Sequence, residues 1–335
     1  MRIKFSVSLI LVSLFLCLIS SHKAFADIDP LPSWNEGKTK TAILDFVKEV
    51  TVVGGANYVH PQDRIATFDQ DGTLWVEQPA YTEWMYAMDN IKLQAPEHPE
   101  WKGKEPFLSI VTGNEQRLRH LSPQEIAQII AITHSGMSVD KYLTLISDWL
   151  RTAEHPRYKR RYTDLIYQPM LEVIDLFHRY GFKTYIVSGG GQEFIRVYSE
   201  EVYGIPTERV IGSTGKVEYQ YNEGKPYLLK LPQMLFVDDK KGKPEGINLI
   251  IGKRPIAAFG NSTGDQQMLE WTQAGKGKRL ELLVHHDDAV REYAYGEGSP
   301  IGTFSNELMR EAENNQWLVV SMKNDWRVIF PWERH

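Results

Sequence analysis

The protein is a chain of 335 residues, of which 42% are hydrophobic and 24% charged, a composition typical of globular proteins that excludes an intrinsically disordered chain. At roughly 150 residues per domain, this length predicts about two structural units with a core large enough to fold without disulfides or a structural metal. Its 38 basic and 43 acidic residues give a net charge of −5. Nucleic acid is therefore not expected as a partner, because no excess of positive charge is present to neutralise phosphates.

The first 26 residues have the three parts of a secretory signal peptide. Two basic residues precede an apolar run over residues 5–19, and the small-residue cleavage site Ala24-Phe25-Ala26 follows. The run is about fifteen residues long, which is short for a membrane-spanning helix of roughly 20. We therefore expect cleavage after Ala26, a periplasmic or secreted mature protein, and no stable membrane association afterwards. The single cysteine, Cys17, leaves with this segment, which excludes disulfides and cysteine nucleophiles from the mature chain.

Residues 27–78 predict the beginning of an α/β core. The spacing of apolar residues predicts a helix over residues 41–50. The β-rich run of residues 64–68 predicts a buried parallel strand that ends abruptly at Asp69-Gln70-Asp71-Gly72-Thr73.

Residues 79–168 predict helices and no convincing strand. Ser122, Pro123 and Glu125 have the pattern of an N-cap, a proline in the first turn and a capping box, and Ser138 precedes a second apolar-periodic run. We therefore expect residues 79–168 to be a helical insert in a core formed by residues 27–78 and 169–335.

Residues 169–335 predict a return to alternating strands and helices. The predicted elements are a helix over 169–180, a strand over 183–188, a helix over 192–203, a strand at 210–211, a hairpin over 217–231, strands over 256–259 and 280–284, and an edge strand over 317–322. Such alternation predicts a parallel, three-layer α/β sheet in which ligands bind at the carboxyl ends of the strands.

Polar residues follow several of these strands. Asp69 and Asp71 crowd one turn, so their two negative charges require a cation or a shared proton. Ser188 and the three glycines after it would present a hydroxyl and backbone amides to an anion near a helix terminus. Asn261 and Asp265 offer oxygen ligands of the kind that Mg²⁺ takes. Lys243 precedes a short helical stretch and could supply a positive charge to a phosphate or to Asp69.

In this order, the motifs resemble those of the haloacid dehalogenase superfamily of phosphatases. The family has a DxDGT motif after its first strand, a Ser or Thr after its second, a Lys before its fourth and an acidic loop after its fourth. Here these read as the Asp69–Thr73 pentapeptide, Ser188, Lys243 and the loop from Gly260 to Asp265. The resemblance covers residues 60–270 and implies a three-layer, Rossmann-like parallel sheet. The insert corresponds to the helical cap of phosphoserine-phosphatase-like members.

The resemblance implies a magnesium-dependent, acid-phosphatase-like phosphomonoester hydrolase acting on a small phosphorylated metabolite. Asp69 would attack phosphorus to form an aspartyl-phosphate, and Asp71 would protonate the leaving oxygen and then activate water. The metal site implied is Asp69, Asp71 through its carbonyl, Asn261 and Asp265. The phosphate site implied is Thr73, Ser188, Gly189 and Lys243. The family usually has Asp where this chain has Asn261, and one lost charge is expected to weaken magnesium binding.

Three features leave alternatives open. The aromatic residues around the start of the insert fit either packing of the insert on the core or a cage for an organic cation, as in a phosphorylcholine-type phosphatase; they are Trp75, Tyr81, Trp84, Tyr86 and Trp101. Asn261 also allows a catalytically weak binding protein of the same fold. His285 and His286 resemble a metal cluster but are more typical of a polar loop. No motif defines the leaving group or the oligomeric state.

Overall fold

The computed structural model describes residues 29–333, so the predicted signal peptide at residues 1–26 lies outside it. Within the described residues, seven strands form one sheet in the order β4-β3-β2-β1-β5-β6-β7. Their bounds are β1 Ile65–Phe68, β2 Lys183–Gly191, β3 Val210–Asn222, β4 Lys225–Phe236, β5 Ala257–Gly260, β6 Leu280–His285 and β7 Leu318–Ser321. Neighbouring strands are parallel except for the antiparallel pair β3–β4. The predicted α/β sheet is thereby confirmed.

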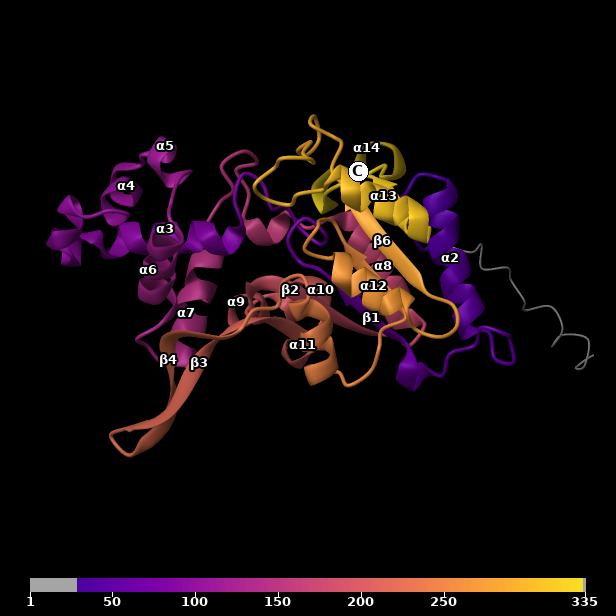
Figure 1. Ribbon diagram of the computed structural model, residues 1–335, viewed down its shortest axis with the longest axis horizontal. Helices are drawn as coiled ribbons and strands as arrows, with labels where there is room; N and C mark the ends of the chain where they lie inside the picture. The colour runs from indigo at the N-terminus through magenta and orange to yellow at the C-terminus, as the bar shows by residue number, and fades with distance from the viewer. Residues whose placement is uncertain (1–28, 334–335) are drawn as a thin grey trace, which may run out of the picture.

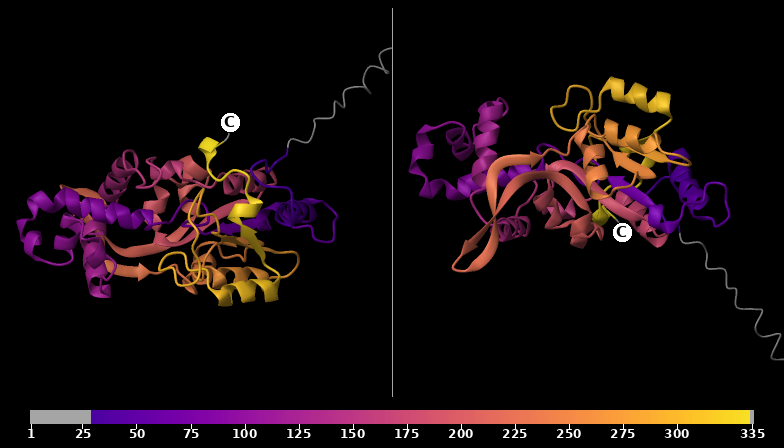
Figure 2. Two further views of the ribbon diagram at one scale, coloured as in Figure 1. Left: turned by 90° about the horizontal axis from the view of Figure 1, so that it is seen from above. Right: turned by 60° about the horizontal axis from the view of Figure 1, so that its bottom comes forward.

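Helices cover both faces of this sheet, which gives the three layers visible in Figures 1 and 2. These helices are α2 Lys38–Thr51, α8 Gln168–Arg179, α9 Gln192–Arg196, α10 Ser199–Tyr203, α11 Gly242–Ile250, α12 Gln266–Gln273, α13 Asn306–Asn315 and α14 Met322–Asp325. Apolar side chains of α2 and α8 pack on one face of the central strands, and those of α11, α12 and α13 on the other. Because both faces are covered, all four residues of β1 are buried.

The register of the central strands aligns their carboxyl ends. Phe68, the last residue of β1, lies opposite Ile186 of β2 and Phe259 of β5. The rings of Phe68 and Phe259 stack with centroids 4.3 Å apart and planes 5° from parallel. Asp69, which begins the loop after β1, therefore lies beside Gly260, the last residue of β5.

A helical segment lies at one end of the molecule, beside the β3–β4 hairpin (Figure 1). Its helices are α3 Thr82–Gln94, α4 Phe107–Thr112, α5 Glu115–Leu118, α6 Pro123–His134 and α7 Val139–Leu150. The capping box that begins α6 is present as predicted, with Ser122 and Glu125 each accepting from the other's backbone amide, and Ser138 caps α7. Short 3₁₀ helices occupy Pro61–Asp63, Ala95–Glu97, Pro99–Gly103, Tyr162–Asp164, Thr207–Arg209 and Pro331–Glu333.

The hairpin is also attached to the helical segment. The Gly136 amide donates to the Lys230 carbonyl and the Lys230 amide to the Met137 carbonyl, both over 2.9 Å. β4, which is the edge strand of the core sheet, thereby joins the sheet to the turn between α6 and α7.

The structure differs from the sequence-based expectation in three places. The helix expected over residues 192–203 is two short helices, α9 and α10. The strand expected at 210–211 and the first arm of the hairpin are one continuous strand, β3. The glycines expected in a turn extend β2 to Gly191, with a register shift between Ser188 and Gly191, because a glycine without Cβ tolerates extended backbone in close contact as readily as a turn.

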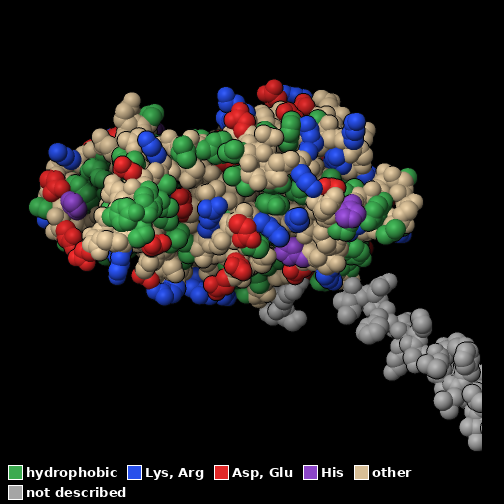
Figure 3. Space-filling model, turned by 90° about the horizontal axis from the view of Figure 1, so that it is seen from below, with side chains coloured by type: hydrophobic (Ala, Val, Ile, Leu, Met, Phe, Trp, Pro, Cys, Tyr) green, Lys and Arg blue, Asp and Glu red, His purple; other side chains and the backbone are tan. Residues whose placement is uncertain are grey.

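The surface of the described residues carries both charged and apolar side chains. Within residues 29–333, no helix has the length and apolar character needed to cross a bilayer. On the face seen from below, charged side chains spread across the whole width with apolar groups between them (Figure 3). Exposed apolar side chains of the hairpin include Tyr219 and Tyr221.

The stacked pair Phe68–Phe259 gives a stability test of this arrangement. We expect Phe68→Ala to lower the free energy of unfolding by about 3–5 kcal/mol, because the side chain is fully buried and leaves a cavity. Urea denaturation monitored by circular dichroism measures this change. Leu93→Ala, at a position 76% exposed, should change it by less than about 0.5 kcal/mol; equal effects of the two substitutions would contradict the described packing.

Candidate active site

A cavity of about 550 Å³ opens where the carboxyl ends of β1, β2 and β5 meet. Several residues predicted for catalysis or phosphate binding line it: Asp69, Asp71, Ser188, Gly189 and Lys243. Three other predicted residues are buried beside it without lining it: Thr73, Asn261 and Asp265. The structure therefore brings all the predicted site residues to one place, in two groups.

A buried lysine bridge is at the centre of the site. Lys243, in the first turn of α11, donates through Nζ to Asp69 Oδ1 and to Asp265 Oδ1, both over 2.6 Å. All three side chains are nearly inaccessible to solvent. Burial alone would lower the pKa of Lys243, but Asp265 and Asp69 raise it above its ordinary value. The two neighbouring carboxyl groups thus favour the charged form of Lys243.

Asp265 holds the loop after β5 in shape. Its Oδ2 accepts from the backbone amides of Asn261 and Ser262, over 2.9 and 3.0 Å, while its Oδ1 accepts from Lys243. Both carboxylate oxygens are thus already engaged, which favours a loop-fixing role over direct metal ligation.

The loop after β1 depends on Gly72. Gly72 has a φ of +74°, and a Cβ there would collide with the Asn261 amide and the Glu77 carboxylate, so only glycine fits. This fold directs Asp71 into the cavity, where its Oδ1 accepts from Trp75 Nε1 over 2.6 Å. Burial, assisted by Glu83, raises the pKa of Asp71 to about 6 although the bond from Trp75 lowers it.

Asn261 is fixed by two side chains. Its Oδ1 accepts from the Thr73 hydroxyl over 3.2 Å, and its Nδ2 donates to Glu77 Oε1 over 2.7 Å. Glu77 is 2% exposed, also accepts from the Tyr295 hydroxyl, and has its pKa raised to about 8, chiefly by burial. Glu77 belongs to no motif that sequence analysis could use, since only the fold brings it to Asn261.

The donor set fits a hard divalent cation in both charge and chemistry. Buried acids outnumber the single buried lysine at the strand ends, and burial together with Asp265 raises the pKa of Asp69 well above its ordinary value. A bound cation would offset this excess of carboxylates. Within the described residues, no three His, Cys, Asp or Glu side chains converge as a metal site. The oxygens of Asp69, the Asp71 carbonyl and Asn261 would therefore form a mixed set of the kind Mg²⁺ accepts.

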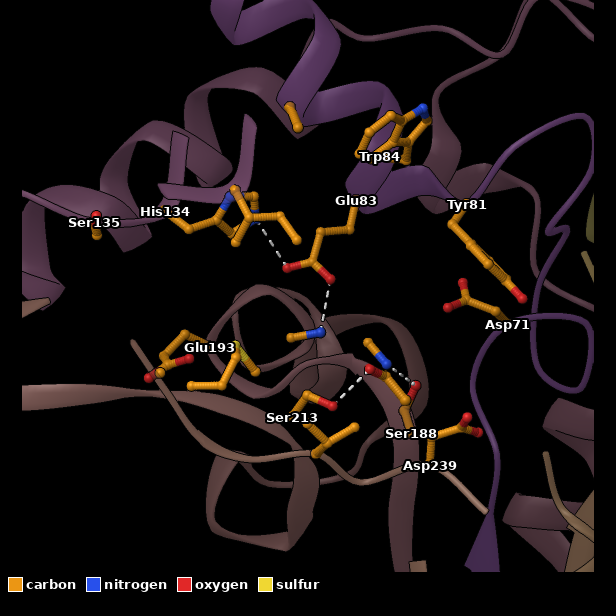
Figure 4. Close-up of a pocket in the computed structure, with 18 of the residues that line it drawn as sticks. Asp71, Tyr81, Glu83, Trp84, His134, Ser135, Ser188, Glu193, Ser213 and Asp239 are labelled. Carbon is orange, nitrogen blue, oxygen red and sulfur yellow. Dashed lines mark hydrogen bonds and ion pairs between the residues drawn. The ribbon is translucent and has the colours of Figure 1, made fainter. Parts of the chain in front are cut away.

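The predicted anion cradle is partly occupied by the protein itself. The Gly190 amide donates to Ser188 Oγ over 3.1 Å, and the Gly191 amide donates to Glu83 Oε2 over 2.7 Å. Figure 4 shows Glu83 reaching from α3 down to this glycine loop. The Gly191 amide is therefore already bonded within the protein, whereas Ser188 and Gly189 line the cavity.

The side of the cavity away from the strand ends is formed by the helical segment and β4. Glu83 Oε1 lies 3.2 Å from His134 Nε2; burial would raise the pKa of Glu83, but His134 and the Gly191 amide lower it below its ordinary value. Lys230, 4% exposed, lies 3.4 Å from Glu193 and 4.4 Å from the centre of the Tyr142 ring. None of these residues belongs to a sequence motif, so the sequence analysis missed them.

The aromatic residues around the start of the insert divide between the two interpretations. Trp75, Tyr86 and Trp101 are at most 5% exposed and pack on other rings, with Trp75 stacked on Tyr198 and Trp101 on Phe107. Tyr81 and Trp84 line the cavity. Packing therefore accounts for three of the five. Trp84 also packs on the apolar cluster of the helical segment, but it and Tyr81 reach the cavity, where they could meet a ligand.

His285 and His286 lie in different surroundings. His285 is half-buried against Phe304. His286 is buried, and its Nε2 lies 2.7 Å from the Gly72 carbonyl oxygen. Within the described residues neither joins a metal cluster.

Comparison with known proteins places this fold. The model of the haloacid dehalogenase-like hydrolases matches residues 66–270. A conserved protein of unknown function from Anaerococcus prevotii DSM 20548 has a TM-score of 0.55 at 14% identity, over 87% of this chain and 94% of that one. Phosphoserine phosphatase from T. onnurineus has a TM-score of 0.35 at 12% identity, over 81% and 96%. At 14% identity, the likeness to the Anaerococcus protein shows the fold alone. No curated protein matches the chain.

The Asn261–Glu77 contact gives a test of the site. In Asn261→Asp, two carboxyl groups would face each other where an amide now donates, so we expect the metal-free variant to hold a proton there more tightly than wild type. Its free energy of unfolding should then keep falling as pH rises from about 8, the raised pKa of Glu77, towards about 9, whereas that of wild type levels off there. Urea denaturation at both ends of this range measures the slope.

The matched control is the double variant Asn261→Asp/Glu77→Gln. It again pairs one amide donor with one carboxylate, with the amide now at position 77 and the carboxylate at position 261. Its slope should be no steeper than that of wild type. A single variant with the wild-type slope would show that the two side chains do not interact.

Proposed function

The chain belongs to the haloacid dehalogenase-like hydrolases, and from this premise we propose that it hydrolyses phosphate monoesters through an aspartyl-phosphate on Asp69. The observation that carries the proposal is the convergence of Asp69, Asp71 and Lys243 on one cavity at the ends of the central strands. A nucleophile, a proton donor and a fixed positive charge are what phosphoryl transfer requires of a protein.

Each residue has a definable task. Asp69 Oδ1 is held by Lys243, which leaves Oδ2 to attack phosphorus; the new O–P bond forms as the bond to the leaving oxygen breaks. Asp71 gives its proton to that oxygen, and its raised pKa keeps part of it protonated near neutral pH. Asp71 then accepts a proton from the water that attacks the aspartyl-phosphate, which releases phosphate and restores Asp69. Ser188, the Gly189 amide and Lys243 would hold the phosphoryl oxygens.

Magnesium is part of the proposal. Asp69, the Asp71 carbonyl and Asn261 would hold the ion, and when bound it would supply positive charge that shields the phosphate from the carboxylates. The intact arrangement of Asp69, Asp71 and Lys243 favours turnover over the alternative of a catalytically weak binding protein.

The cavity suits a small phosphorylated metabolite. We propose that residues 79–168 act as a cap over a core of residues 27–78 and 169–335, because Glu83, Trp84 and His134 of this segment line the same cavity as the catalytic carboxylates. We also propose that residues 1–26 direct export, so that hydrolysis takes place in the periplasm or outside the cell, and that the mature protein has no stable membrane association and no nucleic-acid partner.

A cationic leaving group, as in phosphorylcholine, is the second candidate. Tyr81 and Trp84 line the cavity together with Glu83, Glu193 and Asp239, and aromatic faces beside carboxylates attract quaternary ammonium groups. Lys230 and His134 on the same wall oppose this attraction, so the candidate stands second.

The first test is hydrolysis of p-nitrophenyl phosphate by the mature chain. We expect turnover with magnesium, little after chelation, and a loss of at least about 10³-fold in Asp69→Asn, because the amide cannot act as the nucleophile. Asp140→Asn, at an exposed position, should keep wild-type activity. Undiminished turnover in Asp69→Asn would remove Asp69 as the nucleophile.

The second test compares leaving groups. If Trp84 helps to bind a cation, Trp84→Ala should raise KM for phosphorylcholine about 5–30-fold more than KM for p-nitrophenyl phosphate, which corresponds to about 1–2 kcal/mol of cation–π attraction. The KM of Trp84→Phe for phosphorylcholine should lie between those of wild type and Trp84→Ala. Equal changes for the two esters would assign Trp84 to packing and remove the cationic candidate.

A further inference from the structure

A buried ion pair behind the catalytic loop has no part in the chemistry proposed above. His286 directly follows β6 and is 2% exposed, and Glu292 is fully buried. His286 Nδ1 lies 3.2 Å from Glu292 Oε2, and Nε2 lies 2.7 Å from the carbonyl oxygen of Gly72. The chain between them folds back on itself, since the Tyr295 amide donates to the His286 carbonyl.

The hydrogen-bond partners define the protonation state of His286. An ionised Glu292 and a backbone carbonyl can only accept, so with Glu292 ionised each ring nitrogen carries a hydrogen and the ring is an imidazolium. The titratable groups that face the ring are Glu292, Glu77, Tyr295, stacked at 4.5 Å, and Tyr167 at 5.8 Å; His285 is its chain neighbour. Burial would lower the pKa of His286, but Glu292 and Glu77 raise it above its ordinary value.

The bond from His286 reaches a sensitive point of the site. Gly72 lies between Asp71 and Thr73, in a left-handed conformation that no other residue could adopt there. Its amide donates to the Trp75 carbonyl over 2.9 Å, within the loop, whereas its carbonyl is bound by His286 from another part of the chain. His286 therefore ties this loop to the body of the protein at Gly72, beside the bonds of Gln70 to Tyr203 and of Thr73 to Asn261.

We propose that His286, held by Glu292, is a positioning residue for the hydrolysis, in that it fixes the Gly72 carbonyl and thereby sets the Asp69 and Asp71 carboxylates in the cavity. This inference rests on the proposed function for its catalytic consequence, but not for the ion pair itself. It assigns a role to one histidine of the His-His-Asp-Asp run that differs from metal binding.

The kinetic test compares side chains at position 286 that can donate a hydrogen bond to the Gly72 carbonyl with one that cannot. His286→Leu should lower kcat for p-nitrophenyl phosphate about 100-fold, the effect of a misplaced reacting group, with KM changed less than about threefold. His286→Gln, whose amide nitrogen can still donate to Gly72, should stay within about tenfold of wild type. His285→Gln is the matched control at the neighbouring histidine and should leave kcat unchanged.

A second variant separates positioning from folding. His286→Leu leaves the buried Glu292 without a counter-charge and is expected to lower the melting temperature. In His286→Leu/Glu292→Gln that charge is gone, so the melting temperature should recover while kcat stays low. A kcat that recovers together with the melting temperature would overturn the positioning role.

A spectroscopic readout tests the ion pair without any turnover. Nitrogen-15 NMR of the imidazole rings at pH 7 should show a signal from a ring with both nitrogens protonated that is absent from His286→Gln. A neutral His286 would overturn the proposal. A wild type with the imidazolium signal that hydrolyses no ester would overturn the proposed function and the positioning role together, and would leave the ion pair as a structural element.

Discussion

The Lys243 ammonium group, bound over 2.6 Å to each of two buried carboxylates, is the interaction on which the geometry of the site depends. Asp69 belongs to the loop after β1 and Asp265 to the loop after β5, so one cation from α11 ties together three separate parts of the chain. Parallel strands bring their ends to the same edge but leave the side chains free to rotate. A buried ion bridge removes that freedom, because an unpaired charge in this environment would cost several kcal/mol.

The single positive charge of Lys243 does not balance the negative charges of the acids around it. Other contacts in the site accommodate the remaining acids. Glu77 keeps a raised pKa and receives hydrogen bonds from Asn261 and Tyr295. His286 contributes a second buried positive charge behind the loop. Asn261, where the family resemblance leads one to expect Asp, then has a local explanation. A carboxylate there would face Glu77 directly, whereas the amide donates to Glu77 and still presents an oxygen to the loop after β1.

The parts of the site that depend on strand ends could be predicted from the sequence, whereas the parts that depend on side chains from distant segments could not. Asp69 directly follows a recognisable buried strand, and Lys243 and Asp265 come after it in the order of the family's motifs. All three residues of the ion bridge could therefore be predicted from the sequence. Glu77, Glu83 and Lys230 could not, because each is defined by a contact with a residue more than 50 positions away. The pair His285 and His286 indicated a metal cluster or a polar loop, but not the contact of His286 with Gly72. The glycines after Ser188 were expected in a turn, because glycine permits turns and extended strands alike and its sequence does not distinguish them.

Glu83 belongs to the cavity wall formed by the helical segment and also contacts the glycine loop on the phosphate side. This double contact has a consequence for specificity. The same carboxylate lies on the wall that would face a leaving group and accepts the Gly191 amide of the phosphate-side loop. A substitution there would change the charge that a leaving group meets and at the same time release an amide towards the phosphate. Leaving-group preference and phosphate binding are therefore coupled through one side chain at this position. At Trp84, which lines the cavity without bonding to the glycine loop, the two properties can change separately.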